Sequence, residues 1–184
     1  MVAGITQSYL MYFFTDILII PSAFVMMLMI VARVWDALND PMMGVIVDRT
    51  STKYGKMRPY VLIGSFLMLV TTIVLFMPLT GAPTMFKMIF AAVSYIIFGM
   101  AYTLTDVPAM GLMSVATPSS DERASLLSFY VTVGSVGSLL PVGLLTIFQS
   151  FIPEKYVYFA MSIFVGIITV SYTHLRAHET SLHL

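Results

Sequence analysis

Residues 32–44 read ARVWDALNDPMMG and place Arg33, Asp36 and Asp40 within an apolar segment, directly after the run FVMMLMIV. Each Asp or Arg at the centre of a membrane helix costs about 2.5 to 3.5 kcal/mol, whereas each Leu-like residue contributes only about 0.3 to 0.6 kcal/mol. In a helix the three charges share one face, because they stand at i, i+3 and i+7. Asn39 lies one step around the same side. The pattern predicts a membrane helix whose polar face is turned toward a water-filled cavity or an ion site.

The composition is that of an integral membrane protein. Of 184 residues, 59% are hydrophobic and 10% are charged, and the mean hydropathy is +0.93. A soluble chain of this length could not bury so much apolar surface in one core. The absence of cysteine excludes disulfides and cysteine metal sites, and a formal net charge of zero gives no support to nucleic-acid binding. We therefore expect an all-α, polytopic membrane protein.

Six apolar stretches have lengths near the ~20 residues that span a bilayer. They cover residues 2–20, 24–47, 60–77, 86–113, 126–148 and 156–170. The second and fourth loops between them carry Arg49, Lys53, Lys56, Arg58 and Arg123, whereas the other loops carry only Lys87 and Lys155. The positive-inside rule then predicts a cytoplasmic N-terminus.

The C-terminal tail does not continue this pattern. Residues 170–180 read VSYTHLRAHET, and the chain then ends SLHL. The string resembles a reading frame through a sequencing adapter, so we expect residues 1–168 to form the helical bundle and residues 169–184 to be non-native. On this interpretation the first helix is truncated at its start and the sixth at its end. The alternative is a cytoplasmic tail in which His174 and His178, at i and i+4, bind a metal.

A basic loop follows the second apolar stretch. Residues 44–60, GVIVDRTSTKYGKMRPY, resemble the G-x-x-x-D-R…G-x-x-R signature between helices two and three of major facilitator transporters. Basic side chains in such a loop favour the anionic cytoplasmic face of the membrane. The resemblance implies a cytoplasmic gating loop formed by Gly44, Asp48, Arg49, Gly55, Lys56 and Arg58.

Three further stretches strengthen this resemblance. With them, the chain resembles the glycoside-pentoside-hexuronide:cation symporters, the melibiose-type carriers in particular. The likeness lies in residues 32–44 and in the stretches YLMYFFTD (9–16), YGKMRPYVLIG (54–64) and YIIFGMAYTLTDVPAMGL (95–112). The family fold has twelve helices in two six-helix halves, with sugar and ion between them. The chain is similar to the N-terminal half. The resemblance implies cation-coupled symport of a sugar or glycoside across the inner (plasma) membrane, with the missing second half as a partner.

The resemblance also implies a cation site. Asp36 and Asp40 match the helix-two carboxylates that coordinate the coupling ion, and Asn39 lies beside them. Thr103 and Asp106 match the contributors from helix four. Such oxygen ligands suit Na⁺, Li⁺ or a proton, and no transition metal or other cofactor is expected. We therefore expect the carboxylates of Asp36, Asp40 and Asp106 to lie within a few ångströms of one another.

The expected sugar-binding residues are Asp106, Arg33, Tyr9 and Met110. Arg33 has an alternative role as the charge partner of Asp36 or Asp40, and Tyr9 has one in helix packing. Met110 stands where the melibiose-type carriers have a tryptophan.

Two other sugar contacts of the family are missing. An acidic residue of helix one would fall before Met1, and a helix-five arginine falls near Tyr130 or Val131. These departures weaken the expectation of melibiose specificity more than that of cation coupling.

Two other classes of membrane protein fit the sequence less well. An intramembrane aspartyl protease needs a GxGD motif, which the chain lacks, and a serine type needs GxS with a helical histidine, whereas all histidines lie in the tail. We therefore expect no enzyme. A six-helix channel-like or scaffold protein without coupled transport remains the alternative, although it would not need carboxylates on helices two and four together with the basic-loop signature.

Overall fold

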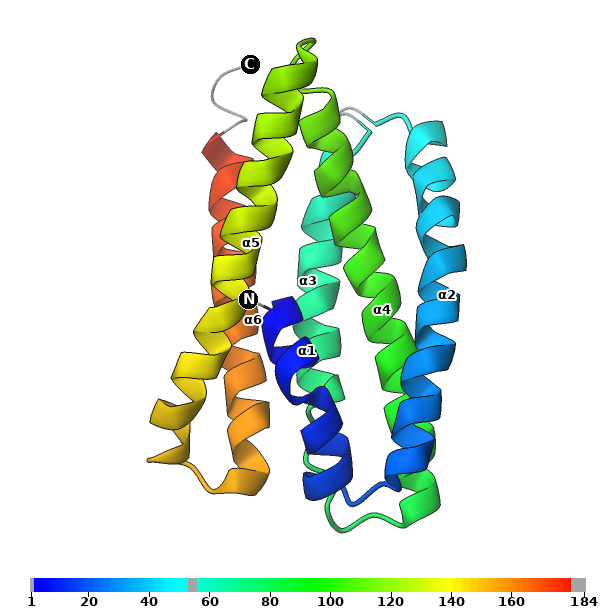
Figure 1. Ribbon diagram of the computed structural model, residues 1–184, viewed down its shortest axis with the longest axis vertical. Coiled ribbons are helices and arrows are strands. Elements are labelled where there is room, and N and C mark those ends of the chain that lie inside the picture. The colour runs from blue at the N-terminus through cyan, green and yellow to red at the C-terminus, as the bar shows by residue number, and fades with distance from the viewer. Residues whose placement is uncertain (1, 53–55, 180–184) are drawn as a thin grey trace.

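The computed structural model describes residues 2–52 and 56–179, and within these ranges all regular secondary structure is helical (Figure 1). In the part of the chain that the structure describes, four segments are long and apolar enough to cross a membrane: α2, α4, α5 and residues 154–171 of α6. The third helix is apolar but shorter. The elements are α1 (Val2–Tyr12), the π-helical turn η1 (Phe13–Ile17), α2 (Ser22–Arg49), α3 (Arg58–Leu75), α4 (Thr84–Ser114), α5 (Ser120–Gln149) and α6 (Glu154–Glu179). The expected all-α, multi-pass architecture is confirmed.

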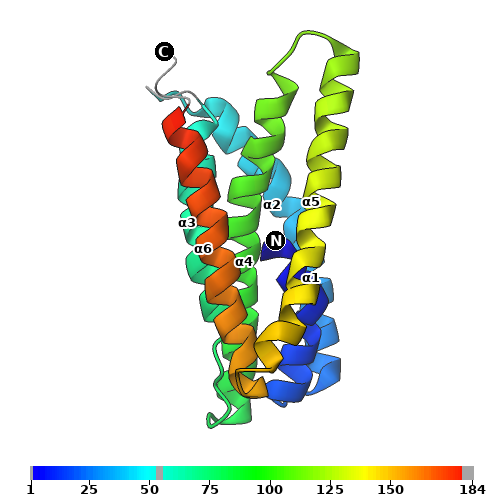
Figure 2. The same ribbon diagram turned by 90° about the vertical axis from the view of Figure 1, so that its left-hand side faces the viewer.

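The helices lie side by side along the long axis of the bundle (Figure 1). Helix α3 packs most extensively on α4 and α6, α2 packs on α4, and α1 packs on α5. Helices α5 and α6 meet at one end and diverge toward the other (Figure 2). The α2–α3 and α4–α5 loops lie at one end, the upper end in Figure 1, and the remaining loops lie at the lower end. The basic loops of the sequence therefore share one end of the molecule.

An aromatic cluster holds the lower end together. The ring of Phe13 lies 5.2 Å from that of Phe76 and 5.9 Å from that of Tyr158, measured between centroids. Tyr9 reaches the same cluster, with its ring 5.6 Å from Tyr158. Aromatic pairs at these separations add to the stabilisation from apolar burial. The cluster fastens α1 and η1 to α3 and α6, so Tyr9 has the packing role that was the alternative to sugar binding.

The turn between η1 and α2 contains an unusual backbone conformation. Ile19 has φ = 57°, which is rare for a β-branched residue. The neighbouring carbonyl of Leu18 accepts a hydrogen bond of 2.9 Å from Nζ of Lys87, whose residue is only 6% exposed. Lys87 is therefore a buried residue of α4 that stabilises this turn, and not the loop residue that the sequence suggested.

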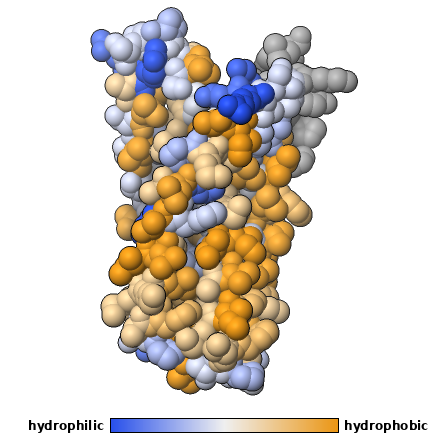
Figure 3. Space-filling model, turned by 90° about the vertical axis from the view of Figure 1, so that its right-hand side faces the viewer, coloured by the Kyte–Doolittle hydropathy of each residue, from blue (hydrophilic) through white to orange (hydrophobic). Residues whose placement is uncertain are grey.

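The sides of the bundle are apolar and its upper end is polar. Figure 3 shows a mostly hydrophobic surface along the length of the molecule, with hydrophilic residues concentrated at the upper end. Large apolar residues on α2 and α5, such as Met27, Ile30, Phe129 and Leu139, are more than half exposed. This distribution fits a molecule surrounded by lipid or by further membrane helices.

Candidate cation and sugar site

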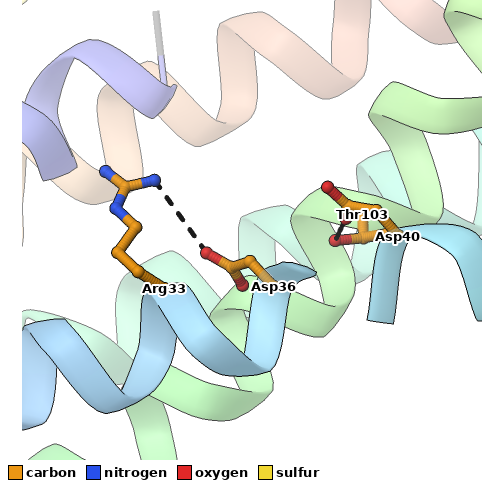
Figure 4. Close-up of polar contacts among 4 residues, drawn as sticks. All are labelled: Arg33, Asp36, Asp40 and Thr103. Atoms are coloured by element: carbon orange, nitrogen blue, oxygen red, sulfur yellow. Dashed lines mark hydrogen bonds and ion pairs between the residues drawn. The ribbon is translucent and has the colours of Figure 1, made fainter. Parts of the chain in front are cut away.

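The polar faces of α2 and α4 meet at Asp40 and Thr103. The hydroxyl of Thr103 donates a hydrogen bond of 2.8 Å to Oδ1 of Asp40 (Figure 4). Thr103 is buried, so this bond satisfies a hydroxyl in the interior, where an unpaired polar group is costly. The hydroxyl oxygen keeps lone pairs that can accept a second partner. The structure thus brings together one residue from each of the two motifs expected to bind the ion.

Asp36 lies one turn before Asp40 and faces α4 as well. Its Oδ2 is 3.9 Å from Nη1 of Arg33, so Arg33 is a charge partner, one of its two expected roles (Figure 4). The Arg33 side chain is 74% exposed and that of Asp36 33%, so solvent screening leaves this pair weak. A Cβ at Gly99 would lie 3.2 Å from Oδ1 of Asp36, which shows how closely α4 approaches this carboxylate. Asn39 is half-buried on the same helix.

Asp106 is held by α5. The phenol of Tyr130 donates a hydrogen bond of 2.9 Å to Oδ1 of Asp106, and both side chains are half-buried. Sequence reasoning identified Tyr130 only as a position where a family contact is lost. Its role as a partner of Asp106 depends on how α4 and α5 are rotated toward each other, which hydropathy does not report.

The expected convergence of three carboxylates is not seen. Among the described residues, no group of three or more Asp, Glu or His lies close enough together to hold a metal ion. Asp36 faces Arg33, Asp40 accepts from Thr103, and Asp106 accepts from the α5 phenol. Like charges repel in a medium of low dielectric, and Asp40 and Asp106 accept hydrogen bonds from two different hydroxyl groups, whereas Asp36 has only the ion pair with Arg33. The joint set Asp36, Asp40 and Asp106 is therefore corrected to a pair of neighbours on α2 and a separate acid on α4.

A cavity of about 380 Å³ opens between α1, α2 and α4. This volume lies within the range of small-molecule sites, roughly 300–1,000 Å³. Figure 3 shows a small hydrophilic area partway along the face that carries α2, between hydrophobic areas. The polar and aromatic residues of its lining include Thr6, Gln7, Arg33, Trp35, Asp36 and Tyr102.

The cavity contains only part of the expected set of sugar-binding residues. Of those expected, Arg33 lines it, whereas Tyr9, Met110 and Asp106 are not among its lining residues. Gln7 and Trp35 line it and were missed by sequence reasoning. A signal was present for both, because Trp35 is the only tryptophan and directly precedes Asp36, and Gln7 is the only amide in its apolar stretch.

Comparison with known proteins decides the family. The family described as MFS/sugar transport protein matches residues 1–180. The chain belongs to this family of sugar transporters. It is 35% identical over 136 residues to the inner membrane symporter YicJ of Escherichia coli (strain K12). The aligned residues cover 72% of this chain and 28% of that protein.

Two further relatives have sugars in their names. The isoprimeverose transporter of Lactiplantibacillus pentosus is 31% identical over 137 residues, which cover 74% of this chain and 28% of that protein. The glucuronide carrier protein homolog of Escherichia coli (strain K12) is 29% identical over 118 residues, which cover 64% of this chain and 26% of that protein. The chain thus spans less than a third of the length of these relatives.

In this MFS sugar transport protein, the expected gating loop joins α2 to α3 at the upper end. Asp48 and Arg49 are exposed at the end of α2, and Nζ of Lys56 donates to the backbone oxygen of Asp48 at 3.3 Å. Arg58 is the first residue of α3. Gly55 lies outside the described residues, as does the side chain of Arg58.

Other residues fasten the same loop. The hydroxyl groups of Thr50 and Tyr60 are 2.5 Å apart and share a hydrogen bond across the loop. A Cβ at Gly111 of α4 would lie 2.9 Å from Sδ of Met57, so Met57 rests on the backbone of α4. A Cβ at Gly44 would meet no other atom within 4 Å. The side chains of His174 and His178, the alternative metal pair, lie outside the described part of the chain.

Proposed function

We propose that this chain forms one half of a symporter that moves a sugar or glycoside across the inner (plasma) membrane together with Na⁺, Li⁺ or H⁺. Membership in the MFS sugar transport family supports the transport of a sugar. The observation that carries the proposal is the hydrogen bond between Thr103 and Asp40, because it joins the two charged membrane helices of a sugar transporter. Charged residues within membrane helices are costly and commonly mark substrate or ion pathways.

The cation site is centred on Asp40 and Thr103. A carboxylate oxygen and a hydroxyl oxygen are the ligands that compact, hard cations prefer. Asp36 and Asn39 stand within one turn of Asp40 on α2 and supply further oxygens.

Charge balance explains why a cation binds. The polar faces of α2 and α4 carry one arginine, Arg33, and three carboxylates, so their sum is −2 when all are ionised. A bound monovalent cation reduces this excess, which lowers the electrostatic free energy in a medium of low dielectric. The chemistry of the interior thus favours cotransport of a positive ion.

The sugar binds in the cavity between α1, α2 and α4. Gln7 offers both a donor and an acceptor to sugar hydroxyls, and Arg33 offers donors. Trp35 presents an aromatic surface for the C–H groups of a sugar ring. Asp36 lines the same cavity and stands one turn from Asp40, so occupancy of the cavity and of the cation site is coupled through α2.

The basic loops set the orientation. The two connections at the upper end of the bundle have basic residues in them or beside them, namely Arg49, Lys56, Arg58 and Arg123. Of the cations at the lower end, Lys87 is buried against Leu18. By the positive-inside rule, these basic residues favour a cytoplasmic location for the upper end.

Asp40→Cys in the complete transporter tests the proposal. The variant removes a cation ligand and leaves the cavity residues in place, so Na⁺ stimulation of sugar uptake should disappear while sugar binding weakens by less than about tenfold. Asp36→Cys should act in the same direction. Asp121→Cys is the matched control, because Asp121 is an exposed residue in the first turn of α5. Unchanged ion dependence in both Asp36→Cys and Asp40→Cys would mean that these charges are structural.

A further inference from the structure

The carbonyl of Leu18 is a buried backbone group that receives its hydrogen bond from a side chain. Leu18 directly follows η1 and is fully buried, and among the described residues no backbone N–H donates to its oxygen. Nζ of Lys87, from the first turn of α4, supplies the hydrogen bond at 2.9 Å. A buried carbonyl without a donor is costly, so this bond fastens α4 to the turn that joins α1 to α2.

The conformation of Ile19 depends on the same peptide group. The φ angle of Ile19 is 57°, and this angle, together with ψ of Leu18, determines where the carbonyl oxygen of Leu18 points. Positive φ is strained for a β-branched residue. The side chain of Ile19 is 72% exposed, so its own packing does little to hold this conformation. The bond from Lys87 acts on the peptide group directly and therefore offsets the strain at Ile19.

The turn connects two walls of the cavity, and Lys87 belongs to the helix of the third. Gln7 lies in the α1 wall, Arg33 in the α2 wall and Tyr95 in the α4 wall. Helix α2 packs along α4, whereas α1 packs chiefly on α5 and α6 and faces α4 across the cavity. Within the described part of the chain, the bond from Lys87 is the only hydrogen bond between α4 and either α1 or the turn after it. This bond therefore determines how far α1 stands from α4.

We infer that Lys87 is a positioning residue for the sugar, because it fixes the width of the cavity between α1 and α4. Lys87 is not one of the residues that line the cavity, so it acts through the turn and not by touching the substrate. The inference rests on the proposed function, which places the sugar in this cavity. The width can be measured without a sugar, so failure of the positioning role can be told from failure of the proposed function.

Chemical cross-linking across the cavity measures its width. Ala3→Cys on α1 and Ile96→Cys on α4 place one thiol on each wall, at two lining residues. The 184 residues contain no cysteine, so the introduced pair is the only one in this half, and the complete transporter without the pair gives the background. The readout is the rate of cross-linking by bifunctional methanethiosulfonates of increasing length, in the complete transporter without sugar.

Lys87→Met removes the hydrogen bond and keeps most of the side-chain volume. A fixed width favours reagents of one length, and Lys87→Met should reduce this preference by about two- to tenfold, the factor that one hydrogen bond contributes. Ile19→Gly should recover most of the preference in the Lys87→Met background, because glycine adopts positive φ without strain. Lys87→Gln, whose side chain is one atom shorter than lysine, serves if Lys87→Met does not fold.

Tyr12→Phe is the matched control. It removes a hydrogen bond of 2.7 Å from Tyr12 to Glu154, which ties α1 to α6 and not to α4. The preference for one reagent length should therefore stay as it is in the unchanged protein. A loss of preference in Tyr12→Phe equal to that in Lys87→Met would show a general loosening of the lower end and would overturn the inference.

Uptake of methyl β-glucoside and methyl β-galactoside by proteoliposomes with the complete transporter links the width to the substrate. Lys87→Met should raise KM by about two- to tenfold, and Ile19→Gly should reverse the rise. An unchanged reagent preference in Lys87→Met, a loss that Ile19→Gly does not recover, or an unchanged KM would overturn the inference while leaving sugar transport intact. If the unchanged protein moves neither glycoside, the proposed function itself fails and this inference falls with it.

Discussion

At the residue scale, the hydroxyl of Thr103 is the group that links Asp40 to α4. The hydrogen bond is 2.8 Å long and joins the buried hydroxyl of Thr103 to the carboxylate of Asp40, which is an exposed residue. The same hydroxyl oxygen can turn a lone pair toward a cation held by Asp40. Replacing Thr103 by a residue of similar shape without the hydroxyl therefore distinguishes its contribution to helix packing from its contribution to cation binding.

Thr103→Val should weaken cation binding more than sugar binding. Valine keeps the shape and removes both the donor and the ligand oxygen, so the Na⁺ concentration for half-maximal stimulation of sugar binding should rise by about tenfold, or 1.4 kcal/mol. Thr103→Ser keeps the hydroxyl and should stay within a few fold of the unchanged protein. An unaltered Na⁺ requirement in Thr103→Val would remove this hydroxyl from the cation site.

At the element scale, the close contact between α3 and α4 depends on Gly64. A Cβ at this position would lie 3.1 Å from the carbonyl carbon of Leu104 and from the backbone nitrogen of Thr105. Both are backbone atoms that cannot move without shifting the helix. Helix α4 carries Thr103 and Asp106, so this contact also fixes the position of the candidate site.

Gly64→Ala should lower the free energy of unfolding by about 1 to 3 kcal/mol, as overpacking of a filled interior does. Gly134→Ala is the matched control, because nothing lies within 4 Å of its Cβ position on α5. There alanine should be neutral or stabilising by up to about 1 kcal/mol, since it is the better helix former. Thermal unfolding of the two variants in detergent measures the difference. Equal midpoints would show that α3 and α4 are not in close contact at Gly64.

The sequence predicts the helices well where hydropathy and helix boundaries coincide. The apolar stretch 86–113 corresponds closely to α4, which spans Thr84–Ser114. Helix α5 begins at Ser120, before its apolar stretch, because Ser119 caps it by accepting from the backbone nitrogen of Glu122 and its first turn is polar. The first stretch ends in a π-helical turn and a strained Ile19, which no periodicity signals.

The candidate site was predictable only in part. Composition and family resemblance identify the charged residues of α2 and α4, because charges in apolar stretches are conspicuous. The partners of these residues depend on tertiary packing. The rotation of α5 that brings Tyr130 to Asp106, and the approach of α1 that makes Gln7 part of the cavity, follow from contacts between distant segments.

At the scale of the whole molecule, the outer helices bury little of their apolar surface against the bundle. Only 6% of the apolar span of α5 and 17% of that of α2 are buried. The chain also covers 28% of the symporter YicJ. Transporters of this kind bind their substrate between two halves and work by rocking one half against the other. We therefore expect that these 184 residues do not transport without a second half.

The most direct measurement is the accumulation of a labelled glycoside in proteoliposomes under an imposed Na⁺ or H⁺ gradient. Vesicles with the complete transporter are compared with vesicles that contain only residues 1–184. The complete transporter should concentrate the sugar against its gradient and stop when the ion gradient is collapsed, and the 184-residue chain alone should show no accumulation. Accumulation by this chain alone, or accumulation by the complete protein that ignores the ion gradient, would contradict the account.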